Sequence, residues 1–91
     1  MRAAAAVVVV VVGACGPIAP SPACVRYVAC ERAYEEAAGV QPVDVAAYEP
    51  EGSCWANEAF ANVCAAECKD AVESLAAASS AANLGVVACE G

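Results

Sequence analysis

The sequence contains no histidine, and this absence removes several kinds of catalytic site at once. Histidine is the commonest general base and the commonest metal ligand, and Ser-His and Cys-His nucleophiles both depend on it. A Gly-rich phosphate loop and a Cys-x-x-Cys redox motif are also missing from the chain. Acidic pairs such as Glu35 with Glu36 and Glu49 with Glu51 remain, but adjacent carboxylates on a helix or a turn are usually solvated. The sequence therefore predicts a protein that is not an enzyme and that needs no cofactor.

Basic side chains are few. The chain has four Lys and Arg residues against eleven Asp and Glu residues, which gives a net charge of −7. Loss of Arg2 with an N-terminal signal would leave three against eleven, or −8. Nucleic acids and anionic lipids attract Lys and Arg, so this balance argues against nucleic acid as a partner. It is compatible with a basic protein partner, or simply with a solvated surface whose charge keeps molecules apart.

Large apolar side chains are scarce once the N-terminus is set aside. After Cys15 the chain has two Leu, one Ile and one Phe, and most of its other apolar residues are alanine. Burial of apolar surface gains about 25 cal/mol per Å², so alanines contribute little each. The chain that follows residue 14 also has a length at which a core alone gives marginal stability. We therefore expect covalent cross-links.

The long apolar run lies at the N-terminus, where Arg2 precedes an uninterrupted stretch over residues 3–12 and the small residues Gly13 and Ala14. A positive charge, an apolar stretch and small residues in this order indicate a secretory signal. A membrane-spanning helix is excluded by length, since residues 3–14 would extend about 18 Å against a hydrocarbon core of about 30 Å.

The end of this signal resembles the lipobox of bacterial lipoproteins. Val12, Gly13 and Ala14 supply the aliphatic and small residues, and Cys15 stands where the lipobox has its cysteine. The resemblance implies a diacylglyceryl thioether on Cys15, removal of residues 1–14 and acylation of the new α-amine. Ordinary cleavage after Ala14 is the alternative, because the same residues suit the common signal peptidase. We expect the lipid on Cys15 to hold the protein to a membrane.

Seven cysteines cannot all pair, but lipid on one of them leaves an even number. The remaining six are Cys24, Cys30, Cys54, Cys64, Cys68 and Cys89. An exported compartment oxidises thiols, so three disulfides are expected. Zinc is the alternative, since Cys64 and Cys68 have the spacing of a structural zinc site and Cys24 with Cys30 would complete four ligands. Behind a signal peptide the disulfides are favoured, and we expect no metal site.

Helix signals divide the rest of the chain into two segments. Ser21 is a typical N-cap, Pro22 is favoured at the first helical position and Gly39 is a typical stop, which predicts a helix over about residues 22–38. The outer side of this helix is expected to carry Arg26, Glu31, Arg32, Glu35 and Glu36.

Ser53 is expected to cap a second helix over about residues 54–78, and residues 43–48 to form one short helical turn before it. The inner stripe of the second helix is expected to consist of Phe60, Cys64, Cys68, Ala71 and Leu75, flanked by Trp55, Val63 and Val72. Gly85 is a plausible final stop. The few large side chains, Trp55 among them, are expected in the core.

These segments predict an all-α fold, in which two antiparallel helices form a disulfide-stapled hairpin. Residues 1–14 would be the signal peptide, residues 15–21 the lipidated cysteine with a Pro-rich extended tether, and residues 22–91 a small disulfide-rich helical domain.

An antiparallel hairpin also suggests which cysteines pair, because disulfides form only where Cα atoms of facing helices lie at the same level. That level matching favours Cys30–Cys64 and Cys24–Cys68, and leaves Cys54–Cys89 by exclusion. The last pair requires the tail to fold back along the second helix. If the helix instead continues through Leu84, Cys89 cannot reach Cys54 and is expected to pair near the open end, with Cys24 or Cys68.

Three short stretches, Cys24-x5-Cys30, Gly52-Ser53-Cys54-Trp55 and Cys64-x3-Cys68, resemble those of small cysteine-rich lipoproteins of high-GC Gram-negative bacteria. The resemblance carries no activity with it. It implies an exported, lipid-anchored protein of the cell envelope, and the lack of catalytic motifs in the sequence favours a structural or protein-interaction role. An acidic inhibitor or immunity-type lipoprotein that binds a basic envelope-active enzyme is the alternative. Gly16 after the lipidated cysteine resembles the outer-membrane sorting pattern of enteric bacteria, which points to the outer membrane.

Overall fold

The first helix begins and ends where its capping residues predict. A computed structural model describes residues 18–90 and places helix α2 at Pro22–Ala38. The Ser21 hydroxyl accepts a hydrogen bond from the backbone N–H of Cys24 at 3.2 Å, and Pro22 occupies the first turn. Gly39 ends the helix in the left-handed region, with φ of 68°, and its N–H donates to the Glu35 carbonyl. Local sequence therefore fixes both ends of α2.

The second long helix, α3 at Glu58–Ala81, begins four residues later than expected. Its N-cap is Asn57, whose side-chain oxygen accepts from the Phe60 N–H at 2.8 Å. The residues expected to start the helix form a separate short 3-10 helix, η2, at Ser53–Trp55. The short turn expected over residues 43–48 is present as η1, at Ala46–Tyr48.

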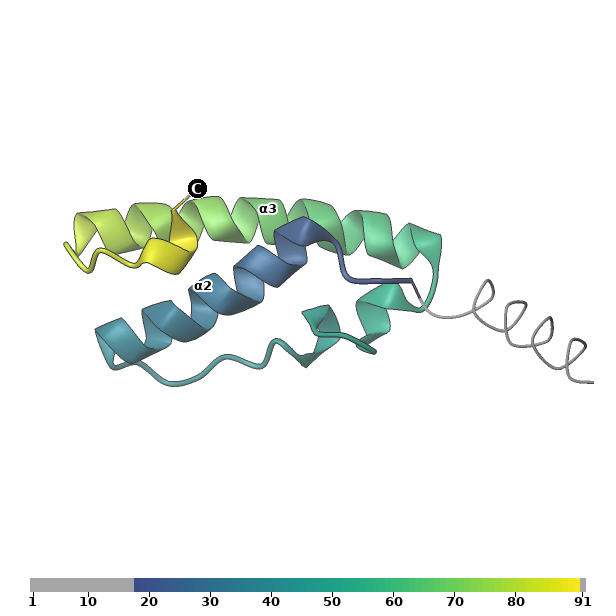
Figure 1. Cartoon of the computed structure of the whole chain (residues 1–91), viewed down its shortest axis with the longest axis horizontal. Helices are drawn as coiled ribbons and strands as arrows, with labels where there is room; N and C mark the ends of the chain where they lie inside the picture. The colour runs from purple at the N-terminus through teal and green to yellow at the C-terminus, as the bar shows by residue number, and fades with distance from the viewer. Residues whose placement is uncertain (1–17, 91) are drawn as a thin grey trace, which may run out of the picture.

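Helices α2 and α3 run side by side in the same direction, so the predicted antiparallel arrangement is wrong (Figure 1). Ala23 and Tyr27 pack in one cluster with Ala61 and Cys68, near the start of both helices. The residues that connect the helices, 39–57, lead the chain back along them. At about 3.3 Å per residue this segment easily spans the roughly 25 Å length of α2. It is therefore long enough to bring the chain back to the level at which α2 begins. The fold is all-α, as predicted, and the described residues include no strand.

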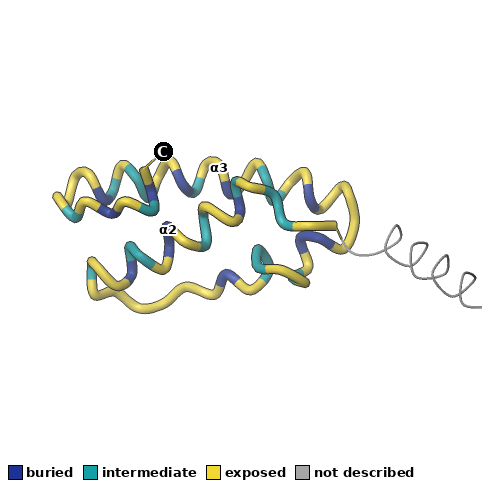
Figure 2. The backbone as a smooth tube through the Cα atoms, in the orientation of Figure 1, coloured by how far each residue is buried: buried dark blue, intermediate teal, exposed yellow. Residues whose placement is uncertain are grey.

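The inner face of α3 is shifted by about one residue from the predicted stripe. Its buried residues are Ala61, Cys68, Val72 and Ser79. The buried parts of α3 lie along its side toward α2 and the C-terminal tail (Figure 2). Phe60 and Val63, expected in or beside the core, are 54% and 57% exposed. A shift of one residue turns a helix by about 100°, which is enough to move these two side chains to the surface.

The C-terminal tail folds back over α2. Asn83 and Gly85 both have positive φ, 58° and 63°, and reverse the chain after α3. A third 3-10 helix, η3 at Val87–Cys89, then lies against α2, and buried Cys30, Val86 and Cys89 form a second core cluster there. The buried N–H of Val86 donates to the Ser79 hydroxyl at 3.2 Å, which ties the tail to the end of α3.

All six cysteines after Cys15 form disulfides, but only one predicted pair is correct. Cys24–Cys68 is confirmed, whereas Cys30 pairs with Cys89 and Cys54 with Cys64. The predicted Cys30–Cys64 and Cys54–Cys89 pairs are wrong because both rest on an antiparallel hairpin. Because the helices run in the same direction, Cys30 lies beside the returning C-terminal tail, which carries Cys89. The short helix η2 places Cys54 next to the start of α3.

Candidate functional site at the disulfide-linked end of the helices

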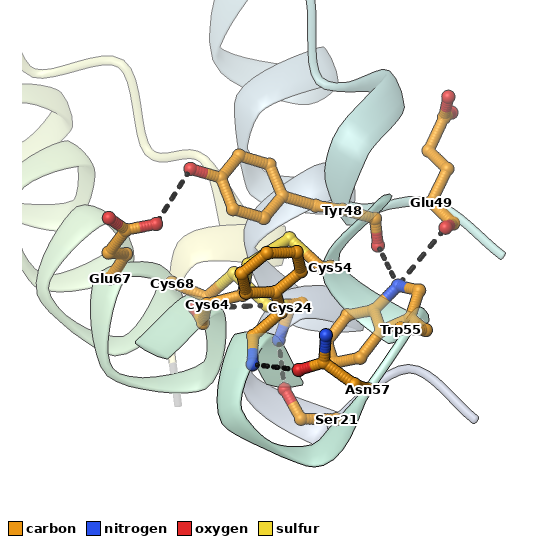
Figure 3. Close-up of a disulfide and its surroundings, with 11 residues drawn as sticks. Ser21, Cys24, Tyr48, Glu49, Cys54, Trp55, Asn57, Cys64, Glu67 and Cys68 are labelled. Carbon is orange, nitrogen blue, oxygen red and sulfur yellow. Dashed lines mark hydrogen bonds between the residues drawn. A yellow bond between two sulfur atoms is a disulfide. The ribbon is translucent and has the colours of Figure 1, made fainter. Parts of the chain in front are cut away.

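Two of the three disulfides lie together at the end of the molecule where α3 begins. Cys24–Cys68 joins α2 to α3, and Cys54–Cys64 joins η2 to α3 across only ten residues of sequence (Figure 3). Both belong to the core cluster that also contains Trp55. The cluster contains no leucine or isoleucine, so it is held by cross-links and one large aromatic ring.

Trp55 is the largest fully buried side chain, at 1% exposure, which confirms its predicted place in the core. Its Nε1–H donates to the backbone carbonyls of both Tyr48 and Glu49, at 3.3 and 3.1 Å (Figure 3). The ring therefore fills the cluster and also satisfies two carbonyls of the connection. Tyr48 in turn stacks edge-on against Tyr27, with ring centroids 5.3 Å apart, which joins the connection to α2.

Gly52 allows the connection to approach η2 closely. A Cβ atom at this position would lie 2.4 Å from the carbonyl oxygens of Ala46 and Ala47, a distance that no side chain tolerates. The Gly52-Ser53-Cys54-Trp55 stretch therefore has a steric basis: glycine permits the contact, and the next residues carry a disulfide and the buried ring.

A shallow groove of about 320 Å³ opens on this end of the molecule. We call it the Phe60 groove, and its lining residues are Ala47, Tyr48, Ser53, Cys54, Phe60, Val63, Cys64 and Glu67. The Tyr48 hydroxyl donates to a Glu67 carboxylate oxygen at 3.3 Å. Burial, and then the charge of Glu67, raise the pKa of Tyr48, so the phenol keeps its proton as a donor.

Two carboxyl groups of α2 are buried, although the sequence predicted that they face water. Glu31 is 6% exposed and Glu35 is 7% exposed. One oxygen of Glu35 accepts from the backbone N–H of Val43 at 2.7 Å, and the other accepts from Arg32 at 3.1 Å. Arg32 also donates to the Val43 carbonyl at 3.2 Å. Glu35 therefore fastens the connection onto α2.

The two carboxyl groups titrate as a pair with pKa values pushed apart. Burial, followed by the hydrogen bond and charge of Glu35, raises the pKa of Glu31 to about 7. The hydrogen bond from Glu31, followed by that from Val43, holds the pKa of Glu35 below its usual value. The pair therefore shares one proton in mildly acidic solution. Sequence could have indicated it, because Tyr27, Glu31 and Glu35 recur every four residues on one face of α2.

This pair predicts a stability maximum at mildly acidic pH. The raised pKa of Glu31 stabilises the folded state fully below about pH 4.5, and this contribution is lost as pH rises through 7. The lowered pKa of Glu35 has the opposite sign, so its contribution is lost as pH falls below its ordinary value. We expect the free energy of unfolding, measured by urea titration, to fall by about 2 kcal/mol from pH 5 to pH 8.

Glu31→Gln should remove most of that decline, because the amide cannot ionise. Glu36→Gln is the matched control, since Glu36 is exposed on the same helix, and it should leave the decline unchanged. An equal decline in the Glu31→Gln variant and the control would contradict the assignment.

No metal centre is formed by the part of the chain that the structure describes. Over residues 18–90, no group of three or more His, Cys, Asp or Glu residues could hold an ion. The four cysteines of the zinc alternative are all in disulfides. Cys24 is bonded to Cys68, Cys30 to Cys89 and Cys64 to Cys54. Sulfur atoms in disulfides are not thiolate ligands, so the zinc alternative is wrong.

The predicted lipidation site, Cys15, and the signal peptide over residues 1–14 lie outside the described residues. Among the helices described, none combines the length and the apolar character needed to cross a membrane. The structure brings the six other predicted site residues into three pairs, two of which form the candidate site.

No protein family, no curated protein and no solved structure matches this chain.

Proposed function

We propose that this is an exported protein of the bacterial cell envelope, anchored by lipid on Cys15, with a protein-interaction or structural role. The observation that carries this proposal is the pairing of the cysteines. Three disulfides use all six cysteines after Cys15, and such dense cross-linking suits an oxidising compartment. Cys15 is then the one cysteine of the sequence outside those pairs, and it stands at the end of a signal-like stretch.

The start of the folded domain is compatible with such an anchor. The backbone N–H of Ile18 donates to the Trp55 carbonyl at 3.4 Å, so the domain already holds the chain at this residue. Only residues 16 and 17 lie between Ile18 and Cys15, and this length of chain spans at most about 11 Å. An anchored domain would therefore carry its disulfide-linked end next to the membrane surface.

The chemistry of the described residues supports interaction rather than catalysis. The six cysteines are oxidised in pairs, and a disulfide offers neither a thiolate nucleophile nor a metal ligand. The buried Glu35 carboxylate is occupied by Val43 and Arg32. What the domain offers to a partner is therefore its rigid, strongly acidic surface.

Replacing Cys15 by Ser is expected to abolish lipid attachment. The wild-type protein should be found in the membrane fraction, with a mature mass that starts at Cys15 and includes three acyl chains, since a single chain gives only marginal binding. The Cys15→Ser protein should lack that mass and leave the membrane fraction. Intact-mass spectrometry of the purified protein measures the difference directly.

The double variant Cys54→Ala with Cys64→Ala is the matched control. It also removes cysteines from the chain, as the Cys54–Cys64 disulfide, but leaves Cys15 in place, so it should keep the lipid mass. Wild-type protein that begins at an unmodified Cys15 would refute the proposal.

A further inference from the structure

We propose that the Phe60 groove binds a basic segment of a partner protein, one that presents an apolar side chain flanked by Lys or Arg. This inference rests on the proposed interaction role and names its surface and the chemistry of its partner. It is carried by an exposed apolar pair, a preformed hollow and a one-sided distribution of charge.

The apolar part of the groove comes from the first turns of α3. Phe60 and Val63 lie three residues apart, hence on one face of the helix, and are 54% and 57% exposed. The Cys54–Cys64 disulfide lies beside them, and Tyr48 is held by its bonds to Glu67 and Trp55. Because these neighbours are fixed by covalent and hydrogen bonds, the hollow exists before any ligand arrives, which lowers the cost of binding.

The charged part of the groove is entirely acidic. Glu67 lines it, and Asp70 follows one turn later on the stripe that begins with Phe60 and Val63. Glu51 lines an adjacent hollow that shares Ser53 with the groove. No Lys or Arg is among the lining residues. An apolar contact with carboxylates beside it complements a partner side chain that is itself flanked by positive charge.

Two other occupants fit this charge pattern poorly. A second copy of the chain in a symmetric dimer would place the acidic residues of one groove close to those of the other, and like charges in close contact oppose association. An anionic lipid surface would be repelled by Glu67 and Asp70 for the same reason. A basic protein segment satisfies both the apolar and the acidic parts.

Fluorescence anisotropy with three labelled nine-residue peptides tests the proposal on the full-length chain. The first peptide has a central Leu flanked by Lys residues, the second replaces each Lys by Glu, and the third replaces Leu by Ser. We expect the Lys–Leu peptide to bind best and to weaken as salt rises, because part of its binding is between screened charges. Equal binding of either altered peptide would overturn the proposal.

Variants of the groove locate the binding. Phe60→Ser with Val63→Ser should weaken the Lys–Leu peptide about tenfold, since an apolar contact is lost. Glu67→Gln with Asp70→Asn should weaken it about two- to fivefold and reduce the salt dependence. Val25→Ser with Val87→Ser is the matched control, because both valines are exposed outside the groove, at 57% and 76%. An equal loss in this control would refute the groove as the site.

Two further measurements assess the rejected occupants. Dimers in sedimentation that the Phe60→Ser with Val63→Ser variant does not form would assign the groove to a second copy. Flotation with anionic vesicles that the same variant loses would assign it to lipid. Either result would overturn the inference. The peptide measurement does not depend on the lipid at Cys15. A protein without lipid would therefore refute the anchor while leaving this inference to be decided by the peptides alone.

Discussion

Replacing both Cys30 and Cys89 by alanine is expected to lower the free energy of unfolding by about 4 kcal/mol. These cysteines are 59 residues apart in sequence, and a cross-link over this distance removes about 4 kcal/mol of chain entropy from the unfolded state. The same reasoning gives about 3 kcal/mol for Cys54–Cys64, which closes only ten residues. Urea titration of the two double variants, followed by circular dichroism, measures both values.

A loss of this size equals most of the stability that so small a core supplies. The tail also depends on this bond, because Val86 and Cys89 are buried against Cys30 and the disulfide is the covalent link between η3 and α2. We therefore expect reduction of all three disulfides to remove most of the helical signal. Full helicity in strong reductant would show that the alanine-rich core contributes more to the free energy of unfolding than its buried apolar area predicts.

Tryptic digestion of the oxidised protein tests the pairing itself. Cleavage after Arg26, Arg32 and Lys69 separates Cys30, in residues 27–32, from Cys89, in residues 70–91. The observed bond joins these two peptides directly, so their combined mass should appear without reductant and vanish with it. The pairing predicted from an antiparallel hairpin would instead link each of them to residues 33–69.

Replacing Trp55 by alanine is expected to cost about 3–5 kcal/mol, the range for removal of a buried aromatic side chain. The ring is 1% exposed in the same core cluster as the two neighbouring disulfides, and its loss would leave a cavity that the cross-linked backbone cannot collapse to fill. It would also leave the Tyr48 carbonyl without its donor, whereas the Glu49 carbonyl would keep its bond from the Gly52 N–H. The midpoint of urea unfolding under oxidising conditions measures the loss.

Phe60→Ala is the matched control, because Phe60 is also aromatic and lies five residues away but is half exposed. It should change stability by about 0.5 kcal/mol or less. Trp55→Phe should fall between the two, since it keeps most of the apolar area but loses the Nε1–H donor. Equal costs for Trp55→Ala and Phe60→Ala would contradict the burial described for these residues.

Local signals in the sequence were sufficient for the bounds of α2, for the presence of α3 and for part of the core. Ser21, Pro22 and Gly39 set the ends of α2 through contacts with residues three or four positions away, which a sequence displays directly. The scarcity of large apolar side chains, together with the six cysteines, indicated a domain that depends on cross-links. Trp55 was placed in the core because few other side chains can fill one.

Long-range geometry was beyond the reach of these signals. Whether two helices run in the same or opposite directions depends on how the connection packs, and residues 39–57 are long enough for either. The relative direction of the two helices decided two of the three disulfides, because it places Cys30 beside Cys89 of η3 and not beside Cys64. The burial of Glu31 and Glu35 and the exposure of Phe60 have the same cause. Burial depends on which segment covers a helix face, and the sequence determines the face but not the segment.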